Sequence, residues 1–144
     1  MPTLKKRAPV RPKLVRRRSA IAGFGVYALQ KIRRDRRIIH YAGQLIGHEE
    51  SDRREKRHLK AGRIWCFTVN RHWVRDASVR GKGNLARFIN HACEPNCWTV
   101  VVGRTIWIRA ARAIKKGEEL TYDYSTGGAA KIRCRCRPGC RRVL

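Results

Sequence analysis

Acidic residues are scarce in this chain: 10 Asp and Glu stand against 35 Lys and Arg, which gives a formal net charge of +25. A surface of this sign attracts polyanions, and nucleic acid is the first candidate. The chain also lacks an apolar run of the roughly 20 residues that span a membrane, so we expect no membrane segment. Its N-terminus is basic without the apolar core of a signal peptide, which predicts an intracellular protein.

Internal repeats and strands that alternate with long helices are also absent. Segments rich in β-branched and aromatic residues predict strands over residues 37–46, 63–70, 72–76 and 119–124. Residues 98–110 predict a hairpin that turns at Gly103 and Arg104. Residues 48–60 predict a surface helix, because their acids come early, their bases come late and apolar residues are few. We therefore expect one mostly β domain with short helices.

The first 18 residues contain no acid and three of the chain's five prolines. Repulsion between like charges and proline both oppose a packed structure, so residues 1–18 are expected to form a flexible arm. Such an arm either contacts nucleic acid or an acidic protein face, or stays a solvated tail.

Gly23 to Ala28 formally match the dinucleotide-binding fingerprint G-x-G-x-x-A. The residues that follow carry no helical apolar stripe, which argues against a dinucleotide-binding unit. Two glycines in a strand more often indicate a bulge or a close backbone approach, and a ligand is one group that could approach.

Polar and metal-binding side chains are concentrated in residues 83–97, which read G-N-L-A-R-F-I-N-H-A-C-E-P-N-C. Asn90, His91, Cys93, Asn96 and Cys97 fall within eight positions, a density that is unusual for a segment that only packs. The alternative is a helix end capped by Asn90, with two buried free cysteines.

Three of the six cysteines, Cys134, Cys136 and Cys140, lie near the C-terminus with the spacing C-x-C-x3-C. Without an export signal, metal binding or free thiols are favoured over a disulfide framework. A closed structural zinc site takes four ligands, so the fourth would come from Cys93 or Cys97. The alternative is an exposed basic tail with free thiols.

Taken in order, these motifs resemble the SET-domain protein-lysine methyltransferases that carry a post-SET zinc segment. The resemblance rests on Gly23-Phe24-Gly25, Tyr41-Ala42-Gly43, Asp76-Ala77, the run from Asn84 to Cys97, Gly117 to Tyr124, and the cysteine tail. Residues 51–56 resemble the trithorax-like branch, and the compact chain suits a bacterial or viral member. The resemblance covers residues 19–144, and it is specific because several independent motifs coincide in order.

The resemblance implies a knotted β fold in which the Asn90-His91 segment is threaded beside the C-terminal motif. It divides the chain into the basic arm (1–18), a SET domain (19–126) and a zinc-binding post-SET segment (127–144). It also implies one structural zinc ion, held by Cys93, Cys134, Cys136 and Cys140, which leaves Cys97 as a bystander.

The same resemblance implies S-adenosylmethionine in one cleft and a substrate lysine that enters from the opposite face through a narrow channel. The residues that would contact the cofactor are Phe24, Gly25, Tyr41, Arg87, Asn90 and His91. Tyr124 matches the catalytic tyrosine, and Tyr122 matches the position where the family alternates Phe and Tyr. Trp65 stands at a channel position where the family often has tyrosine, and a larger ring without a hydroxyl would reshape the channel beside Tyr122 and Tyr124.

These residue types suit methyl transfer to an amine. The reaction is an in-line displacement, so positioning matters most. The attacking lysine must be neutral, although a free lysine has a pKa of about 10.4. An aromatic channel desolvates the ammonium and lowers its pKa, and the positive charge of the cofactor adds to this effect. A hydroxyl at Tyr122 leaves less room for added methyl groups, which predicts mono- or di-methylation.

We expect the substrate lysine in a histone or another nucleic-acid-associated protein, or in a protein with an acidic face. Histone tails are themselves basic, so for a histone the attraction to this chain would come from nucleosomal DNA, with DNA, RNA or nucleosome contact through the arm. One alternative is a zinc-stabilised nucleic-acid-binding module in which Trp65, Trp73, Trp98 and Trp107 stack on bases. The alternation of Trp98 and Trp107 with β-branched residues predicts burial for these two. The other alternative is an inactive SET scaffold that binds a partner. The oligomeric state does not follow from these patterns.

Overall fold

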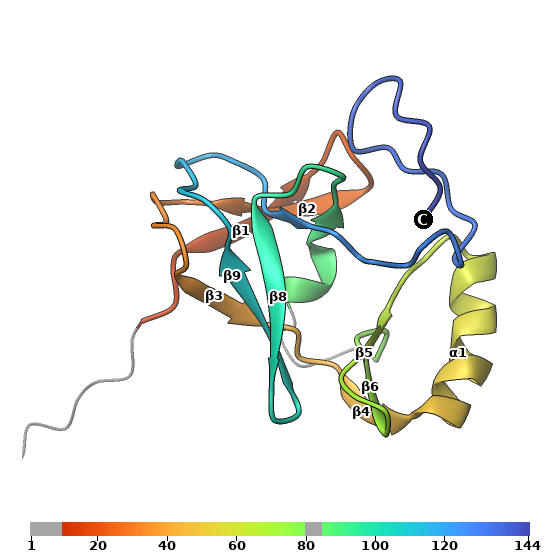
Figure 1. Ribbon diagram of the computed structural model, residues 1–144. Helices are drawn as coiled ribbons and strands as arrows, with labels where there is room; N and C mark the ends of the chain where they lie inside the picture. The colour runs from red at the N-terminus through yellow and green to blue at the C-terminus, as the bar shows by residue number, and fades with distance from the viewer. Residues whose placement is uncertain (1–9, 80–84) are drawn as a thin grey trace, which may run out of the picture.

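A computed structural model describes residues 10–79 and 85–144 (Figure 1). The first nine residues of the predicted arm and Asn84 of the central motif lie outside the described residues. The elements are, in order, β1 (Leu14–Arg18), β2 (Phe24–Ala28), β3 (Arg37–His40), β4 (Gln44–Gly47), α1 (His48–Lys60), β5 (Cys66–Thr68), β6 (Trp73–Asp76), the 3-10 helix η1 (Leu85–Phe88), β7 (Asn90–His91), β8 (Cys97–Val102), β9 (Thr105–Ala110) and β10 (Thr121–Tyr122).

The strands of the described residues form small sheets rather than one large one. β1 pairs with β2, β9 lies between β3 and β8, and β6 lies between β4 and β5, all antiparallel. β7 and β10 form a two-stranded parallel pair. This mostly β architecture with short helices is the one predicted, and no helix in the described part of the chain is long and apolar enough to cross a membrane.

The core contains aliphatic side chains from segments far apart in the sequence. Those with almost no exposure include Val26, Ile32, Ile89, Ile108 and Leu120. In β9, alternate residues are buried, as expected for a strand with one face on the core. The sheets are thus joined by shared burial of their inner faces.

Helix α1 has the predicted bounds and character. Glu49 and Glu50 lie in its first turn and Arg57, His58 and Lys60 in its last, where they complement the helix dipole. Its one buried residue is Ser51, so the helix covers the molecule from outside, as Figure 1 shows.

The predicted hairpin is also confirmed, as β8 and β9. It turns at Gly103, whose φ of 62° is readily reached by glycine. The predicted burial of Trp98 is wrong, because its side chain lies on the outer face of the edge strand β8 and is 42% exposed. Trp107 is half-buried beside His40, with the ring centroids 5.5 Å apart.

The prediction of a flexible arm up to Arg18 is wrong for Leu14–Arg18, which form β1 and pair along the whole of β2. Pro12 is already buried. The arginines are accommodated because they lie on the outer side, where Arg16 stacks over the rings of Phe24 and Phe88 at 4.7 and 4.8 Å. Cation–π contact and access to water together offset the like-charge repulsion.

The single strand predicted over residues 37–46 is two strands, β3 and β4, which belong to different sheets. The chain changes sheet between Tyr41 and Gly43. A Cβ at position 43 would lie 2.8 Å from the Asp76 carbonyl carbon, so only glycine allows this approach to β6. This contact with the backbone of Asp76 explains why residue 43 is a glycine.

Candidate active site and zinc centre

The parallel pairing of β7 with β10 brings the polar central motif beside the tyrosine motif. Asn90 lies opposite Thr121 and His91 opposite Tyr122. The expectation that the Asn90-His91 segment lies beside the C-terminal motif is therefore confirmed. Every group described below is positioned from this pair of strands.

The side chain of Asn90 is held by three acceptors. Its Nδ2 donates to the carbonyl oxygens of Ala22 (3.2 Å) and Phe24 (2.9 Å) and to Oε1 of Glu119 (2.9 Å). Because all three are acceptors, the orientation of the amide is fixed. Oδ1 receives no hydrogen bond from any described residue, so it is available to a donor from outside.

The carboxylate of Glu119, which accepts from the Asn90 amide, also accepts hydrogen bonds from Ser19 and Tyr27. The hydroxyl of Ser19 donates to both carboxylate oxygens, at 2.8 and 2.9 Å, and the Tyr27 hydroxyl donates to Oε2 at 3.3 Å. A Cβ at Gly25 would lie 2.8 Å from Cδ of Glu119 and closer still to Oε1. The group that approaches Gly25 is thus this carboxylate, and sequence reasoning missed Glu119 altogether.

A cavity of about 310 Å³ lies beside Asn90, and we call it the Asn90 cavity. Its walls come from the β1–β2 turn, the end of α1, strand β7 and the C-terminal segment: Ile21, Ala22, Gly62, Asn90, His91, Ile132, Arg133, Cys134, Arg135 and Leu144. In Figure 1 the C-terminal segment passes near the end of α1, which closes this side of the molecule.

A second cavity of about 400 Å³, the tyrosine cavity, is lined by α1, β5, the β8–β9 hairpin and the chain from β10 onward. Four aromatic rings in its wall contact one another around Phe67. The centroid of Phe67 lies 4.9 Å from Tyr41, 5.8 Å from Tyr122 and 5.2 Å from Tyr124. Tyr122 and Tyr124 are 5.0 Å apart. Phe67 is a site residue that the sequence did not reveal.

Burial raises the pKa of Tyr41, Tyr122 and Tyr124 well above its ordinary value, so all three hydroxyls are neutral at physiological pH. The Tyr124 hydroxyl donates to the Ile89 carbonyl, and Tyr41 donates to the Trp65 carbonyl at 2.8 Å. The Tyr122 hydroxyl has no hydrogen-bond partner within residues 10–79 and 85–144. It is therefore free to bind a water or a ligand in the cavity.

The two cavities meet at His91 and Tyr124. His91 lines the Asn90 cavity, Tyr124 lines the tyrosine cavity, and their ring centroids are 5.4 Å apart. The backbone N–H of Tyr124 donates to Nδ1 of His91 at 3.0 Å. Burial lowers the pKa of His91, which keeps Nδ1 an acceptor. The two cavities are thus adjacent, with the His91–Tyr124 pair between them.

Two predicted residues lie elsewhere than expected. Tyr41 was predicted to contact the cofactor, but it lines the tyrosine cavity. The ring of Trp65, predicted for the channel, packs against the guanidinium of Arg87 at 4.5 Å, and Phe67 supplies the ring at the tyrosines. Only the carbonyl of Trp65 contacts Tyr41.

The other predicted cofactor residues are distributed around Asn90. Phe24 and Gly25 reach the Asn90 cavity through the hydrogen bond of the Phe24 carbonyl and through Glu119. The guanidinium of Arg87 stacks on the rings of Trp65 and Phe88. Its buried Nε has no hydrogen-bond partner among the described residues. Of the six, Asn90 and His91 form the wall itself.

The four cysteines predicted as zinc ligands, Cys93, Cys134, Cys136 and Cys140, come together with all Sγ atoms within 4.8 Å of one another. Cys93 Sγ lies 3.8 Å from Cys134 Sγ and 3.9 Å from Cys140 Sγ. A tetrahedral zinc ion with Zn–S bonds of about 2.3 Å separates its sulfurs by about 3.8 Å, so the cluster fits the ion.

The short spacing before Cys140 is bridged by a tight turn in which Gly139 has a φ of 79°. The backbone N–H of Arg142 lowers the pKa of the Cys140 thiol to about 7, which favours the thiolate that zinc needs. Cys97, by contrast, is buried, and its thiol donates to Asn96 Oδ1 at 3.4 Å. Burial raises the pKa of Cys97 to about 12, which fits a bystander.

A second group of potential ligands, His58, Cys66 and Asp76, also lies within 4.8 Å. Its carboxylate is already compensated, because Arg54 Nη1 donates to Asp76 Oδ2 at 3.0 Å and the Ser78 N–H donates to Oδ1 at 2.8 Å. Burial also raises the pKa of Cys66 to about 12. We therefore interpret this group as a buried ion pair.

Comparison with known proteins adds independent findings. A family model described as the SET domain matches residues 23–125. Over 138 residues the chain is 41% identical to a histone-lysine N-methyltransferase, H3 lysine-4 specific, of Debaryomyces hansenii, and over 135 residues it is 44% identical to histone-lysine N-methyltransferase trithorax of Drosophila virilis. Both alignments cover 88% of this chain.

The relatives are much longer proteins. The chain spans 12% of the Debaryomyces protein and 3% of the Drosophila protein. Histone-lysine N-methyltransferase set1 of Dictyostelium discoideum, which is 42% identical over 135 residues, is matched over 9% of its length. The likeness therefore concerns only a small part of each relative.

Proposed function

The chain belongs to the SET-domain family, and from this we propose that it transfers a methyl group from S-adenosylmethionine to the side-chain amine of a protein lysine. The single observation that best supports this proposal is the contact of the two cavities at His91 and Tyr124. A cofactor on one side and an amine on the other would face each other there.

The Asn90 cavity suits the cofactor. The Asn90 side chain presents an unused carbonyl oxygen, which can accept from an ammonium group. When bound, S-adenosylmethionine supplies a methyl group on a positively charged sulfur. Asn90, His91 and the backbone at Phe24 and Gly25 would hold and orient it.

The tyrosine cavity suits the lysine. Its aromatic wall desolvates an ammonium group and lowers the pKa of that group, which favours the neutral amine. The Tyr124 hydroxyl donates to the Ile89 carbonyl, so the lone pairs on its oxygen can accept from the amine and aim it. Because Tyr124 stays neutral, we propose that its role is alignment rather than proton removal.

The unpartnered hydroxyl of Tyr122 supports a product limited to mono- or di-methyl-lysine. A water bound there would occupy the space that a further methyl group needs. The cysteine cluster supports a structural role for zinc, because Cys134 also lines the Asn90 cavity. A zinc ion held by Cys93, Cys134, Cys136 and Cys140 would fix that wall.

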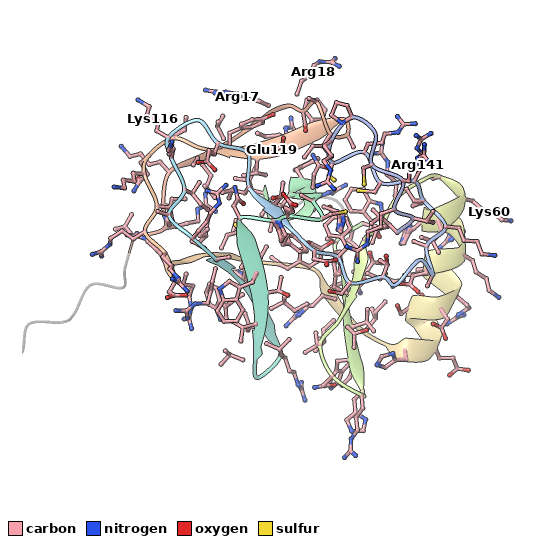
Figure 2. The ribbon with its side chains drawn as sticks, turned by 45° about the horizontal axis from the view of Figure 1, so that its top comes forward. Arg17, Arg18, Lys60, Lys116, Glu119 and Arg141 are labelled. Carbon is pink, nitrogen blue, oxygen red and sulfur yellow. The ribbon has the colours of Figure 1, made fainter. Side chains whose placement is uncertain are left out.

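We propose a histone or another nucleic-acid-associated protein as the substrate, because three relatives are named histone-lysine N-methyltransferases. Contact with DNA, RNA or a nucleosome is proposed for the exposed arginines of β1; Figure 2 shows Arg17 and Arg18 at the edge of the molecule. The free cysteines outside the cluster, Cys66 and Cys97, suit a reducing intracellular compartment.

The test is transfer of labelled methyl from S-adenosylmethionine to core histones, nucleosomes and ribosomal proteins. Tyr124→Phe is expected to lower the rate by about 10²- to 10³-fold, a loss typical of removing one positioned hydrogen-bonding group, while calorimetry shows unchanged cofactor binding. Tyr27→Phe, which removes a hydroxyl outside the tyrosine cavity, should stay active.

Wild-type protein that is folded and zinc-loaded, yet neither binds the cofactor nor labels any of these substrates, would refute the proposed function. Cofactor binding without transfer would favour the inactive scaffold. Full activity of Tyr124→Phe would refute only the assignment of that residue.

A further inference from the structure

The tyrosine cavity has the opposite charge to the rest of the chain. Among residues 10–79 and 85–144, the charged ones in its wall are Glu55 and Asp123, and no lysine or arginine of these ranges lines it. This occurs in a chain with 35 Lys and Arg and only 10 Asp and Glu. The cavity is therefore a local acidic site within a basic molecule.

The two acids differ in what already binds them. Asp123 lies 3.7 Å from the guanidinium of Arg142 and accepts from the Ser125 N–H at 2.8 Å. Glu55, on α1, makes no hydrogen bond or ion pair with any residue that the structure describes. A carboxylate left unpaired beside so many cations is unusual, because pairing would be easy to achieve.

The surroundings of Glu55 favour an incoming cation. Partial burial raises the pKa of Glu55, and the charges of Asp52 and Asp76 raise it further; His58 and His48 act in the opposite direction and form no ion pair with it. The adjacent residue, Arg54, donates hydrogen bonds to Glu50 and Asp76 and not to Glu55. A cation that reaches Glu55 would thus relieve the cost of an unpaired, partly buried carboxylate.

We propose that Glu55 is a specificity-determining residue that binds a second cationic side chain of the substrate, an arginine or lysine close in sequence to the lysine that is methylated. The inference rests on the proposed function, since that function places the substrate in the tyrosine cavity. Arginine suits the site best, because its planar guanidinium can pair with both oxygens of one carboxylate.

The net charge of the chain does not oppose this binding at close range. Charges farther than about 10 Å apart are largely screened at 0.1 M salt, so repulsion by distant arginines is weak in the cavity. The nearest charges determine the electrostatic potential that an incoming cation meets, and in the described part of the wall these are the carboxylates of Glu55 and Asp123. A basic segment of the substrate is thus accepted locally by a protein that is basic overall.

Binding of labelled peptides tests the inference. Each peptide has eleven residues, a central lysine, and one arginine moved through the four positions on either side in a background of Gly, Ala and Ser. A glutamine series is the reference. Fluorescence polarisation would compare wild type, Glu55→Gln and the matched control Glu49→Gln, an exposed acid in the first turn of the same helix.

Wild type and Glu49→Gln should bind at least one arginine peptide about five-fold more tightly than its glutamine counterpart, the size of a partly exposed ion pair. Glu55→Gln should bind the two equally, and added salt should weaken the preference. Wild type without any arginine preference, or Glu55→Gln with the preference intact, would overturn the inference.

Mass spectrometry of the same peptides after incubation with S-adenosylmethionine separates this result from the proposed function. Methylated lysine without an arginine preference supports the function and refutes the role of Glu55. An arginine preference that depends on Glu55, with no methylated peptide or protein substrate, refutes the function and leaves a cation-binding site.

Discussion

Gly25 and Glu119 provide the sharpest test of how the Asn90 cavity is built. A methyl group at position 25 would enter the space of the Glu119 carboxylate, 2.8 Å from its Cδ. Gly25→Ala must therefore displace Glu119 from Ser19 and Asn90. In Glu119→Ala the carboxylate is already gone, and the remaining close neighbour of the methyl group is Ser19 Cβ at 3.1 Å, which needs to move only a few tenths of an ångström, so the further cost should be small. The prediction is that the two substitutions are strongly non-additive.

The magnitude follows from the contacts. Overpacking of this kind costs about 1–3 kcal/mol, so Gly25→Ala should lower the free energy of unfolding by about 2 kcal/mol. Glu119→Ala removes the shared acceptor of Ser19, Tyr27 and Asn90. Hydrogen bonds to a charged group contribute about 1.5–3 kcal/mol each, and access of water reduces this to about 2–3 kcal/mol in total. The double variant should resemble Glu119→Ala, with a coupling of about 2 kcal/mol.

Urea unfolding of the zinc-loaded protein measures this cycle, and calorimetric titration with S-adenosylmethionine measures its effect on the cavity. Because Glu119 restrains the Asn90 side chain, Glu119→Ala should weaken cofactor binding about ten-fold, or 1.4 kcal/mol. Gly47→Ala is the control for Gly25, since nothing lies within 4 Å of its added Cβ. Glu118→Ala is the control for Glu119, since its carboxylate pairs with Arg112 at 3.0 Å.

Additive effects, with a coupling below about 0.5 kcal/mol, would show that Gly25 is not reserved for the carboxylate. Unchanged cofactor affinity in Glu119→Ala would show that the Asn90 side chain needs no such restraint. Either result would refute the corresponding role of Glu119, as the group that requires glycine at position 25 or as the restraint on the Asn90 side chain.

Three further predictions concern other parts of the molecule. Cys136→Ser should lose its zinc by elemental analysis and bind the cofactor more weakly, whereas Cys97→Ser should keep the metal; retained zinc would contradict the ligand assignment. Tyr122→Phe should shift the methyl-lysine products toward higher methylation by mass spectrometry, and an unchanged distribution would count against its role. Asp76→Asn leaves Arg54 with Glu50 as its remaining charge partner and should cost about 2 kcal/mol in urea unfolding. Hydrogen bonds from Ser78 and Arg54 lower the pKa of Asp76, so this difference should shrink only as pH falls below about 4, and a pH-independent difference would refute its electrostatic origin.

Features determined by local sequence were predicted well. Helix α1 has the predicted bounds because its charges follow the helix dipole. The β8–β9 hairpin turns where Gly103 allows a positive φ. The four cysteines come together as the resemblance implied, whereas the C-x-C-x3-C spacing alone left both Cys93 and Cys97 open as the fourth member.

Features determined by distant contacts were not predicted. Glu119 bonds to Ser19 across 100 residues, and no local pattern indicates that partner. Trp65 packs against Arg87 rather than the tyrosines, so Phe67 takes the place expected for it. Leu14–Arg18 form a strand because they pair with β2. The composition of residues 1–18, which are basic and rich in proline, does not reveal this pairing partner.

The cysteine cluster links metal binding to the cofactor cavity. The apolar side chains buried at the cluster are few, chiefly Leu144 with partial cover from Ile64 and Ile132. So small a core contributes little stability, whereas binding of structural zinc contributes about 10–16 kcal/mol in small zinc modules. Because Ile132, Cys134 and Leu144 also line the Asn90 cavity, the shape of that wall would depend on a zinc ion bound at the cluster. Zinc would thus control cofactor affinity without touching the cofactor, by holding in place a segment that its own packing cannot hold.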